Sequence, residues 1–214
     1  LRHAPRLAPL ITAIGVSIVL QNLAMMIWGR EYHSFPQLIA NTPLNFGGAI
    51  INDIQVIIFV MALAIMAGLM LLVHRTKLGR AMRAVAENQH AAQLMGVDIN
   101  RVISITFMLG SALAAVAGLM VSANYGLAHY YMGFLLGLKA FTAAVLGGIG
   151  NLRGAMLGGL LLGLIESLGA GYIGDLTGGF MGSNYQDVFV FFVLIAVLVF
   201  RPSGLLGERI AERA

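Results

Sequence analysis

Few side chains in this sequence could take part in acid–base chemistry, and two of them lie where charge is costly. The 214 residues include 13 Lys and Arg, 9 Asp and Glu, 5 His and no Cys. Lys139 and Glu166 fall inside apolar stretches, where an ionised group costs about 2.5–3.5 kcal/mol on insertion scales. Either the two side chains pair across neighbouring helices, or Lys139 extends to the membrane surface as an anchor. We expect a structural role for both, while a role in ion-coupled transport is the alternative.

No other arrangement of residues predicts catalysis. The His residues are scattered, and no His-Glu-x-x-His zinc pattern occurs. Lys77 and Lys139 are followed by Leu and Ala, whereas the lysine of a P-loop is followed by Ser or Thr. We therefore expect no catalytic residue, no metal site and no cofactor bound by this chain.

The composition predicts a membrane protein. Hydrophobic residues make up 59% of the chain and charged residues 10%, too few charges to cover a soluble globule. Backbone groups must be satisfied internally in lipid, and the apolar segments lack alternating polarity, so we predict helices. Six stretches qualify: Leu10–Trp28, Ile54–Val73, Val102–Ala123, Leu135–Ile149, Gly154–Ile173 and Val188–Phe200. The expected fold is therefore all-α, a polytopic transmembrane bundle of about six helices, although Leu135–Ile149 and Val188–Phe200 are short and the segment around Leu135 could be re-entrant.

The basic residues predict how this bundle is oriented. Six passes place both ends of the chain, the loops at 74–101 and 151–153 and a tail at 201–214 on one side of the membrane. Of the 13 Lys and Arg, only Arg30 and Lys139 fall elsewhere. By the positive-inside rule that side is cytoplasmic. The net charge of +4 then marks a membrane face, and we expect no nucleic-acid partner.

Small residues recur every four positions in two of the predicted helices. One row contains Gly110, Ala114 and Gly118, and a second contains Gly154 and Gly158. Residues four apart share a helix face, and small residues let helices approach closely in lipid. We predict that both rows pack against other helices.

The loop 74–101 is alanine-rich, charged and free of proline, so it is predicted to be helical. Apolar residues fall near one face at helical spacing, and Gly96 suits a helix end. The apolar face comprises Leu78, Met82, Val85, Ala92 and Met95. Such an amphipathic helix either binds a partner or lies on the membrane surface.

At this loop the sequence resembles a known family, the branched-chain amino acid permeases of ATP-binding-cassette importers (LivH-like inner-membrane subunits). His90-Ala91-Ala92 followed by Gly96 is similar to the family's Glu-Ala-Ala, three residues, Gly coupling pattern, with His in place of Glu and without the trailing Leu-Pro. The likeness extends over nearly the whole chain. It includes ITAIGVSIVLQN at 11–22, GRAMRAVAENQHAAQLMGVDINRVISITF at 79–107, GLKAFTAAVLGGIGNLRGAMLGGLLLGLIESL at 137–168 and FRPSGLLG at 200–207. Family members carry additional helices before this point, so we expect the chain to lack N-terminal helices.

The resemblance implies a non-enzymatic transport subunit, with residues 1–214 as a single transmembrane permease domain in the bacterial inner membrane. Its cytoplasmic loop would dock on separate ATPase subunits, which would bind ATP and Mg²⁺. The residues that the resemblance places in this coupling role are Ala84, Glu87, His90, Ala91, Ala92 and Gly96. Further implied partners are a second, LivM-like permease subunit and an extracytoplasmic substrate-binding protein. The same machinery importing urea or short-chain amides is one alternative, and a secondary transporter is another.

Overall fold

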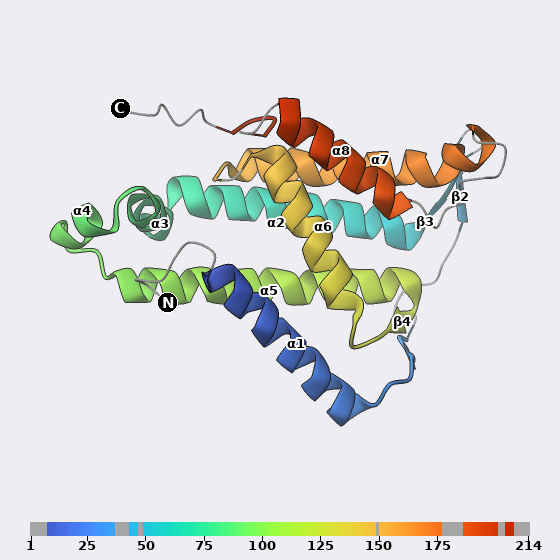
Figure 1. The fold of residues 1–214 in the computed structure, drawn as a ribbon, viewed down its shortest axis with the longest axis horizontal. Coiled ribbons are helices and arrows are strands. Elements are labelled where there is room, and N and C mark those ends of the chain that lie inside the picture. The colour runs from blue at the N-terminus through green and yellow to red at the C-terminus, as the bar shows by residue number, and fades with distance from the viewer. Residues whose placement is uncertain are drawn as a thin grey trace. The chain divides into compact units, whose positions relative to one another are not determined.

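The computed structural model describes residues 8–36, 43–46, 49–148, 150–176, 186–200 and 204–207, which are mostly helical (Figure 1). The chain divides into two compact units, Leu1–Tyr131 and Met132–Ala214. Within the first unit the helices are α1 Ala8–Trp28, α2 Asp53–Arg75, α3 Lys77–Glu87, α4 Gln89–Leu94 and α5 Ile99–Tyr125. The second unit contains α6 Met132–Gly147, α7 Leu152–Leu176 and α8 Gln186–Phe200.

The six long helices lie at the six apolar stretches that the sequence predicts. Four of them, α1, α2, α5 and α7, are long and apolar enough to cross a membrane. Helices α6 and α8 have 16 and 15 residues, which rise only about 24 and 22 Å at about 1.5 Å per residue. These lengths are below the roughly 30 Å of a hydrocarbon core. A multi-pass membrane protein with at least four spanning helices follows from these lengths.

The all-α prediction was incomplete, because the described parts of the loops contain four short strands. Strand β1 (His33–Ser34) pairs antiparallel with β4 (Leu127–Ala128), and β2 (Pro43–Phe46) pairs antiparallel with β3 (Ala49–Asn52). Pairing satisfies backbone groups of the connections between helices. Strands of two to four residues are too short to produce a period-two hydrophobic pattern, so the sequence did not indicate them.

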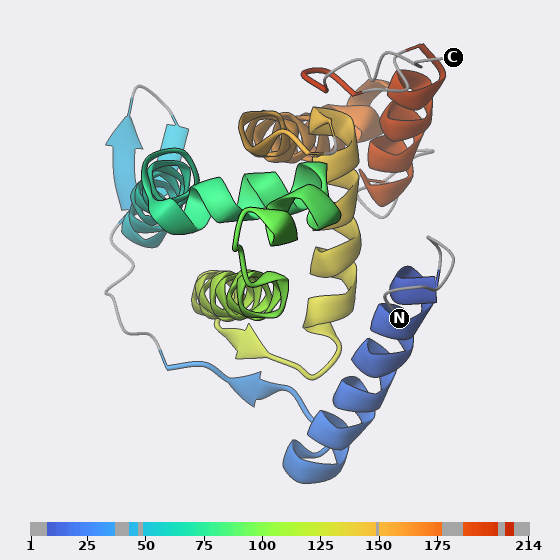
Figure 2. The same ribbon diagram turned by 90° about the vertical axis from the view of Figure 1, so that its left-hand side faces the viewer.

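In the first unit, α3 lies across the ends of α2 and α5. Figure 1 shows α2 and α5 running side by side, and Figure 2 shows both end-on, with α3 running roughly perpendicular to them from the end of α2. Thr76 makes the corner between α2 and α3. Its hydroxyl donates to the Leu72 carbonyl oxygen at 2.6 Å and accepts from the Gly79 N–H at 3.1 Å. One residue thus ends α2 and caps the N-terminus of α3.

Gly79 allows the first turn of α3 to touch the last turn of α2. A Cβ atom at this position would lie 2.1 Å from the Val73 carbonyl oxygen and 2.4 Å from that of Leu72. Both neighbours are backbone atoms, so no side chain can rotate away. The absence of a side chain at Gly79 therefore fixes the loop helices to the end of α2.

Replacing Gly79 with alanine is expected to detach α3 from α2. Overpacking typically lowers the free energy of unfolding by about 1–3 kcal/mol. At Gly79 the strain can be relieved if α3 moves away from the end of α2. The matched control is Gly68→Ala in α2, where a Cβ would have nothing within 4 Å. Limited proteolysis of the loop in detergent should accelerate several-fold for Gly79→Ala and stay unchanged for Gly68→Ala. Equal proteolysis rates for the two variants would contradict this account.

In the second unit, a tight turn joins α6 and α7 into a helix hairpin, which is held by very close backbone contacts near the turn. A Cβ on Gly154 would lie 2.3 Å from the Gly147 carbonyl oxygen, and a Cβ on Gly158 would lie 2.2 Å from the Ala143 carbonyl oxygen. Further along the same seam, Ala143, Leu146 and Leu162 form a small buried core. The helices can meet this closely only because the seam consists of glycine and alanine near the turn.

Residues 204–207, which belong to the tail predicted at 201–214, pack on the turn between α6 and α7. The Leu205 and Leu206 N–H groups donate to the carbonyl oxygens of Leu146 and Gly147 at 2.9 and 3.0 Å. The Asn151 amide donates to the Leu206 carbonyl oxygen at 2.8 Å. These bonds satisfy carbonyl groups that the end of α6 would otherwise leave unpaired. The rest of that predicted tail, 201–203 and 208–214, lies outside the described residues.

Candidate functional site

The loop 74–101 forms two helices, α3 and α4, where the sequence predicts one amphipathic helix. The break is at Asn88, whose backbone is extended (φ −153°, ψ 108°) and whose side chain accepts the Ala91 N–H at 3.0 Å. Asparagine readily bonds to nearby backbone in this way, so it favours helix caps over helix interiors. The cap turns α4 back against α3 and α5.

A small apolar core holds the two loop helices against α5. Val85 of α3, Ala92 of α4 and Val102 of α5 are all buried, with relative exposures of 4–7%. Ala84 is half-buried and packs against this cluster, as does Val97. Of the candidate coupling residues, Ala84 and Ala92 therefore pack inside the loop and set its shape.

Gly96 ends helix α4 as the sequence predicts. Its backbone is left-handed, with φ +81°. Its N–H donates to the Gln93 carbonyl oxygen at 3.0 Å, and the Val97 N–H donates to that of Ala92 at 3.1 Å. This pair of bonds is a Schellman motif, which requires a residue with positive φ and so favours glycine. Gly96 therefore directs the chain from α4 back to α5.

The remaining candidate coupling residues, Glu87, His90 and Ala91, are exposed on the outer side of the two loop helices. The end of α4 is the most exposed apolar part of the loop, because Leu94 and Met95 are 89% and 84% exposed. Met95 was predicted on the same apolar face as Val85 and Ala92, and it is exposed whereas those two side chains are buried. Figure 1 shows α4 beyond α3, farther from the long helices. An apolar tip is thus presented on the far side of the loop.

Lys139 and Glu166 form an ion pair across α6 and α7. Lys139 Nζ lies 2.5 Å from Glu166 Oε1, and the two side chains are 26% and 23% exposed. Lys139 is the eighth of the 16 residues of α6, so the pair lies halfway along the helix. It is on the seam of Gly147 and Ala143, at steps of four residues. Of the two alternatives for Lys139, the structure therefore shows the ion pair with Glu166 and not extension to a membrane surface.

The two rows of small residues differ in what they contact. Gly154 and Gly158 of α7 meet the backbone of α6, as described above. Gly110 and Gly118 of α5 would place a Cβ with nothing within 4 Å among the described residues, and Ala114 between them is exposed.

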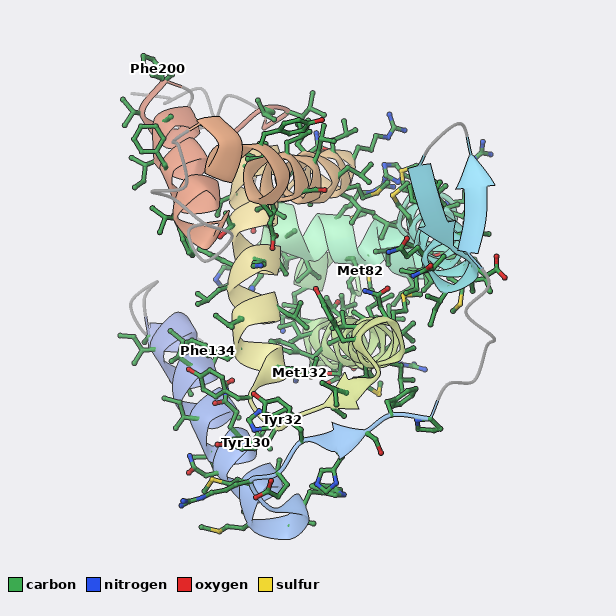
Figure 3. All side chains as sticks on the ribbon, turned by 90° about the vertical axis from the view of Figure 1, so that its right-hand side faces the viewer. Tyr32, Met82, Tyr130, Met132, Phe134 and Phe200 are labelled. Atoms are coloured by element: carbon green, nitrogen blue, oxygen red, sulfur yellow. The ribbon has the colours of Figure 1, made fainter. Side chains whose placement is uncertain are left out.

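An aromatic cluster beside β1 and β4 was missed by the sequence analysis. The Tyr32 and His129 rings stack with centroids 4.4 Å apart, and the Tyr130 ring lies 4.2 Å from that of His129. His129 Nε2 is 3.3 Å from the Arg30 carbonyl oxygen, and the Tyr131 N–H donates to His129 Nδ1 at 3.3 Å. Figure 3 shows Tyr32 and Tyr130 side by side. The run His-Tyr-Tyr was a visible signal, but its partner is 97 residues earlier.

Within the described residues, no group of three or more His, Asp or Glu side chains is arranged to hold a metal ion. The features with a specific geometry are therefore the loop helices with their apolar tip and the ion pair inside the α6–α7 hairpin.

Comparison with known proteins identifies the family. The family described as branched-chain amino acid transport system / permease component matches residues 1–198. The chain is 46% identical to the high-affinity branched-chain amino acid transport system permease protein BraD of Pseudomonas aeruginosa, over 100% of this chain and 68% of that protein. It is 41% and 40% identical to the permease proteins LivH of Salmonella typhimurium and Escherichia coli, over 99% of this chain and 68% of each relative.

No solved structure matches the chain. The family assignment therefore comes from sequence, over almost the full length of the chain. With its spanning helices and its loop between α2 and α5, the chain belongs to the branched-chain amino acid transport system permease family.

Proposed function

We propose that this protein is a permease subunit of an ATP-binding-cassette importer that carries branched-chain amino acids across the bacterial inner membrane. It would act with ATPase subunits that bind ATP and Mg²⁺, a second LivM-like permease subunit and an extracytoplasmic substrate-binding protein. Relatives more than 40% identical carry the name of high-affinity branched-chain amino acid permeases, which supports this substrate class. The chain contributes the membrane path and no catalytic group.

The proposed topology has six spans with both ends in the cytoplasm. Four helices are long and apolar enough to cross a membrane, and the shorter helices α6 and α8 would be the fifth and sixth spans. Short helices are accommodated where the bilayer thins or where polar neighbours extend the span. The asymmetry of Lys and Arg supports the cytoplasmic side for the loop 74–101.

The observation that carries the proposal is the apolar tip of α4 on a loop fixed to two spans. Leu94 and Met95 are almost fully exposed, and apolar side chains that protrude from a charged loop are typical of a protein interface. Gly79 and the core of Val85, Ala92 and Val102 join this tip to α2 and α5. Movement of an ATPase bound at the tip would thereby reach both helices, and transport requires that the two states differ in such contacts.

Uptake in reconstituted vesicles tests the function. The protein with its co-encoded partner subunits should accumulate labelled leucine only when ATP is on the side of the loop 74–101 and the binding protein is on the other side. Leucine uptake driven by an ion gradient without ATPase subunits would overturn the proposal in favour of a secondary transporter. ATP-dependent uptake of urea or acetamide, with none of leucine, would overturn the substrate class alone.

Replacing Leu94 with serine should uncouple the ATPase from the permease. The side chain is 89% exposed, so its loss leaves the fold of the chain intact while it removes an apolar contact to the partner. Central apolar contacts of interfaces are worth about 2 kcal/mol or more, and we expect stimulated ATP hydrolysis to fall at least tenfold. The control is Gln93→Ser, at the neighbouring exposed position. Normal stimulation in Leu94→Ser would show that the tip is not the contact.

A further inference from the structure

A groove of about 430 Å³ lies beside the contact between α3 and α5, and the start of α4 also lines it. Its walls are mainly apolar and include Met82 and Val85 of α3 and Ile103 and Phe107 of α5. Arg83 also lines it and is the charged residue of the set. Figure 3 labels Met82, which lies between the two helices. The groove thus combines a hydrocarbon-like surface with a single guanidinium group.

The orientation of α3 places this groove at the surface of the membrane. Helix α3 lies across the ends of α2 and α5 (Figure 2), which is the orientation of an amphipathic helix in the interface plane. The 27 residues of α5 rise about 40 Å, so about 10 Å of the helix extends beyond a hydrocarbon core of about 30 Å. Ile103 lies about one turn from the start of α5, at the loop-side end of its predicted span, and Phe107, which is 74% exposed, lies one turn further along.

Arg83 is available for an anion. Its side chain is exposed, and within the described part of the chain it has no ion pair or hydrogen bond to a side chain. The groove's own hydroxyl, from Thr106, donates instead to the Val102 carbonyl oxygen at 2.8 Å. The loop around Arg83 is basic overall, because 74–101 contains five Lys and Arg against two acids.

We propose that this groove binds an anionic glycerophospholipid of the adjoining leaflet. One acyl chain would lie against Met82, Ile103 and Phe107, and the Arg83 guanidinium would donate to the phosphodiester. A planar guanidinium matches phosphate oxygens with two parallel hydrogen bonds. A zwitterionic lipid offers the same phosphate but adds a cation beside the basic loop. The site therefore favours a headgroup with net negative charge.

This proposal needs only a protein in a membrane, so it stands or falls separately from the ATP-driven function. Leu94 and Met95 at the end of α4 serve the proposed partner contact, and neither of them lines the groove between α3 and α5. The competing occupant is a segment of a partner subunit, which the test below distinguishes.

Native mass spectrometry of the purified full-length permease in detergent provides the test. With equal amounts of phosphatidylglycerol and phosphatidylcholine of the same chain length, one phosphatidylglycerol should be retained with about tenfold preference. Arg83→Gln should reduce that preference to parity. Arg80→Gln is the matched control, because Arg80 is exposed on the same helix and does not line the groove. It should keep the preference.

A second variant tests the acyl chain independently of charge. Ala86 lines the groove and is exposed on α3, so Ala86→Phe should fill the space and displace the lipid while Arg83 remains. Equal retention of the two lipids by the wild type would overturn the proposal. Equal losses in Arg83→Gln and Arg80→Gln would also overturn it, since only the total charge would then matter. Loss of the bound lipid when the partner subunits assemble would identify the groove as a subunit contact.

Discussion

Replacing Gly158 with alanine is expected to prevent stable packing of α6 on α7. The new Cβ would lie 2.2 Å from the Ala143 carbonyl oxygen and 2.8 Å from the Gly147 nitrogen. Both are backbone atoms inside helices, so relief requires the two helices to separate along the seam. Overpacking costs about 1–3 kcal/mol, and we expect the upper end of this range because no side chain can rotate away. Marginally stable proteins do not tolerate such a loss well.

The measurement is the amount and melting temperature of monodisperse protein in detergent. Gly163→Ala is the control, because this glycine is on the same helix and a Cβ there would have nothing within 4 Å. We expect Gly163→Ala to match the wild type or exceed it slightly, since alanine is the better helix former by about 1 kcal/mol. Wild-type melting of Gly158→Ala would show that α6 and α7 are farther apart than described here.

Replacing Lys139 with methionine should leave the Glu166 carboxylate without its cation halfway along the hairpin. An unpaired ion at this depth costs up to about 2.5–3.5 kcal/mol, and the partial exposure of both side chains makes that value an upper limit. We expect lower yield and a melting temperature reduced by several degrees. The double variant Lys139→Met with Glu166→Leu should recover most of the loss, because replacing both members of an ion pair is often neutral.

The double variant also distinguishes a structural pair from a transport residue. If the pair only joins two helices, the double variant regains ATP-driven uptake together with its stability. Recovered stability without uptake would instead give Lys139 and Glu166 a direct part in transport. The reversed pair, Lys139→Glu with Glu166→Lys, should behave like the wild type in the structural case, since it keeps one cation and one carboxylate in contact.

The helices of this protein were largely predictable from sequence, because each arises from local properties. The apolar stretches fix where long helices form, and the structure shows Asp98 and Asn151 capping the starts of α5 and α7. Gly96 was predictable as a helix end, because glycine readily adopts positive φ. The break at Asn88 was missed, because a single asparagine in an alanine-rich run is a weak signal beside the helical periodicity.

The candidate site residues were also predictable only where local sequence determines them. The sequence gives the loop 74–101, the two small-residue rows and the two charges in apolar segments, since composition and spacing are properties of a linear chain. Whether Lys139 pairs or extends to a surface depends on which face of α6 meets α7. That choice rests on the contacts of Gly147, Gly154 and Gly158, which bring the backbones together.

By itself, the sequence determined that this is a helical membrane protein of the branched-chain permease type with a basic loop on one side. Only the tertiary structure decided that α3 lies across two spans, that Leu94 and Met95 protrude, and that Arg83 borders an apolar groove. The physical reason is the sequence separation between the residues that determine each property. Helix formation and hydropathy depend on residues within a few positions of each other, whereas exposure, pairing and grooves depend on side chains that only folding brings together.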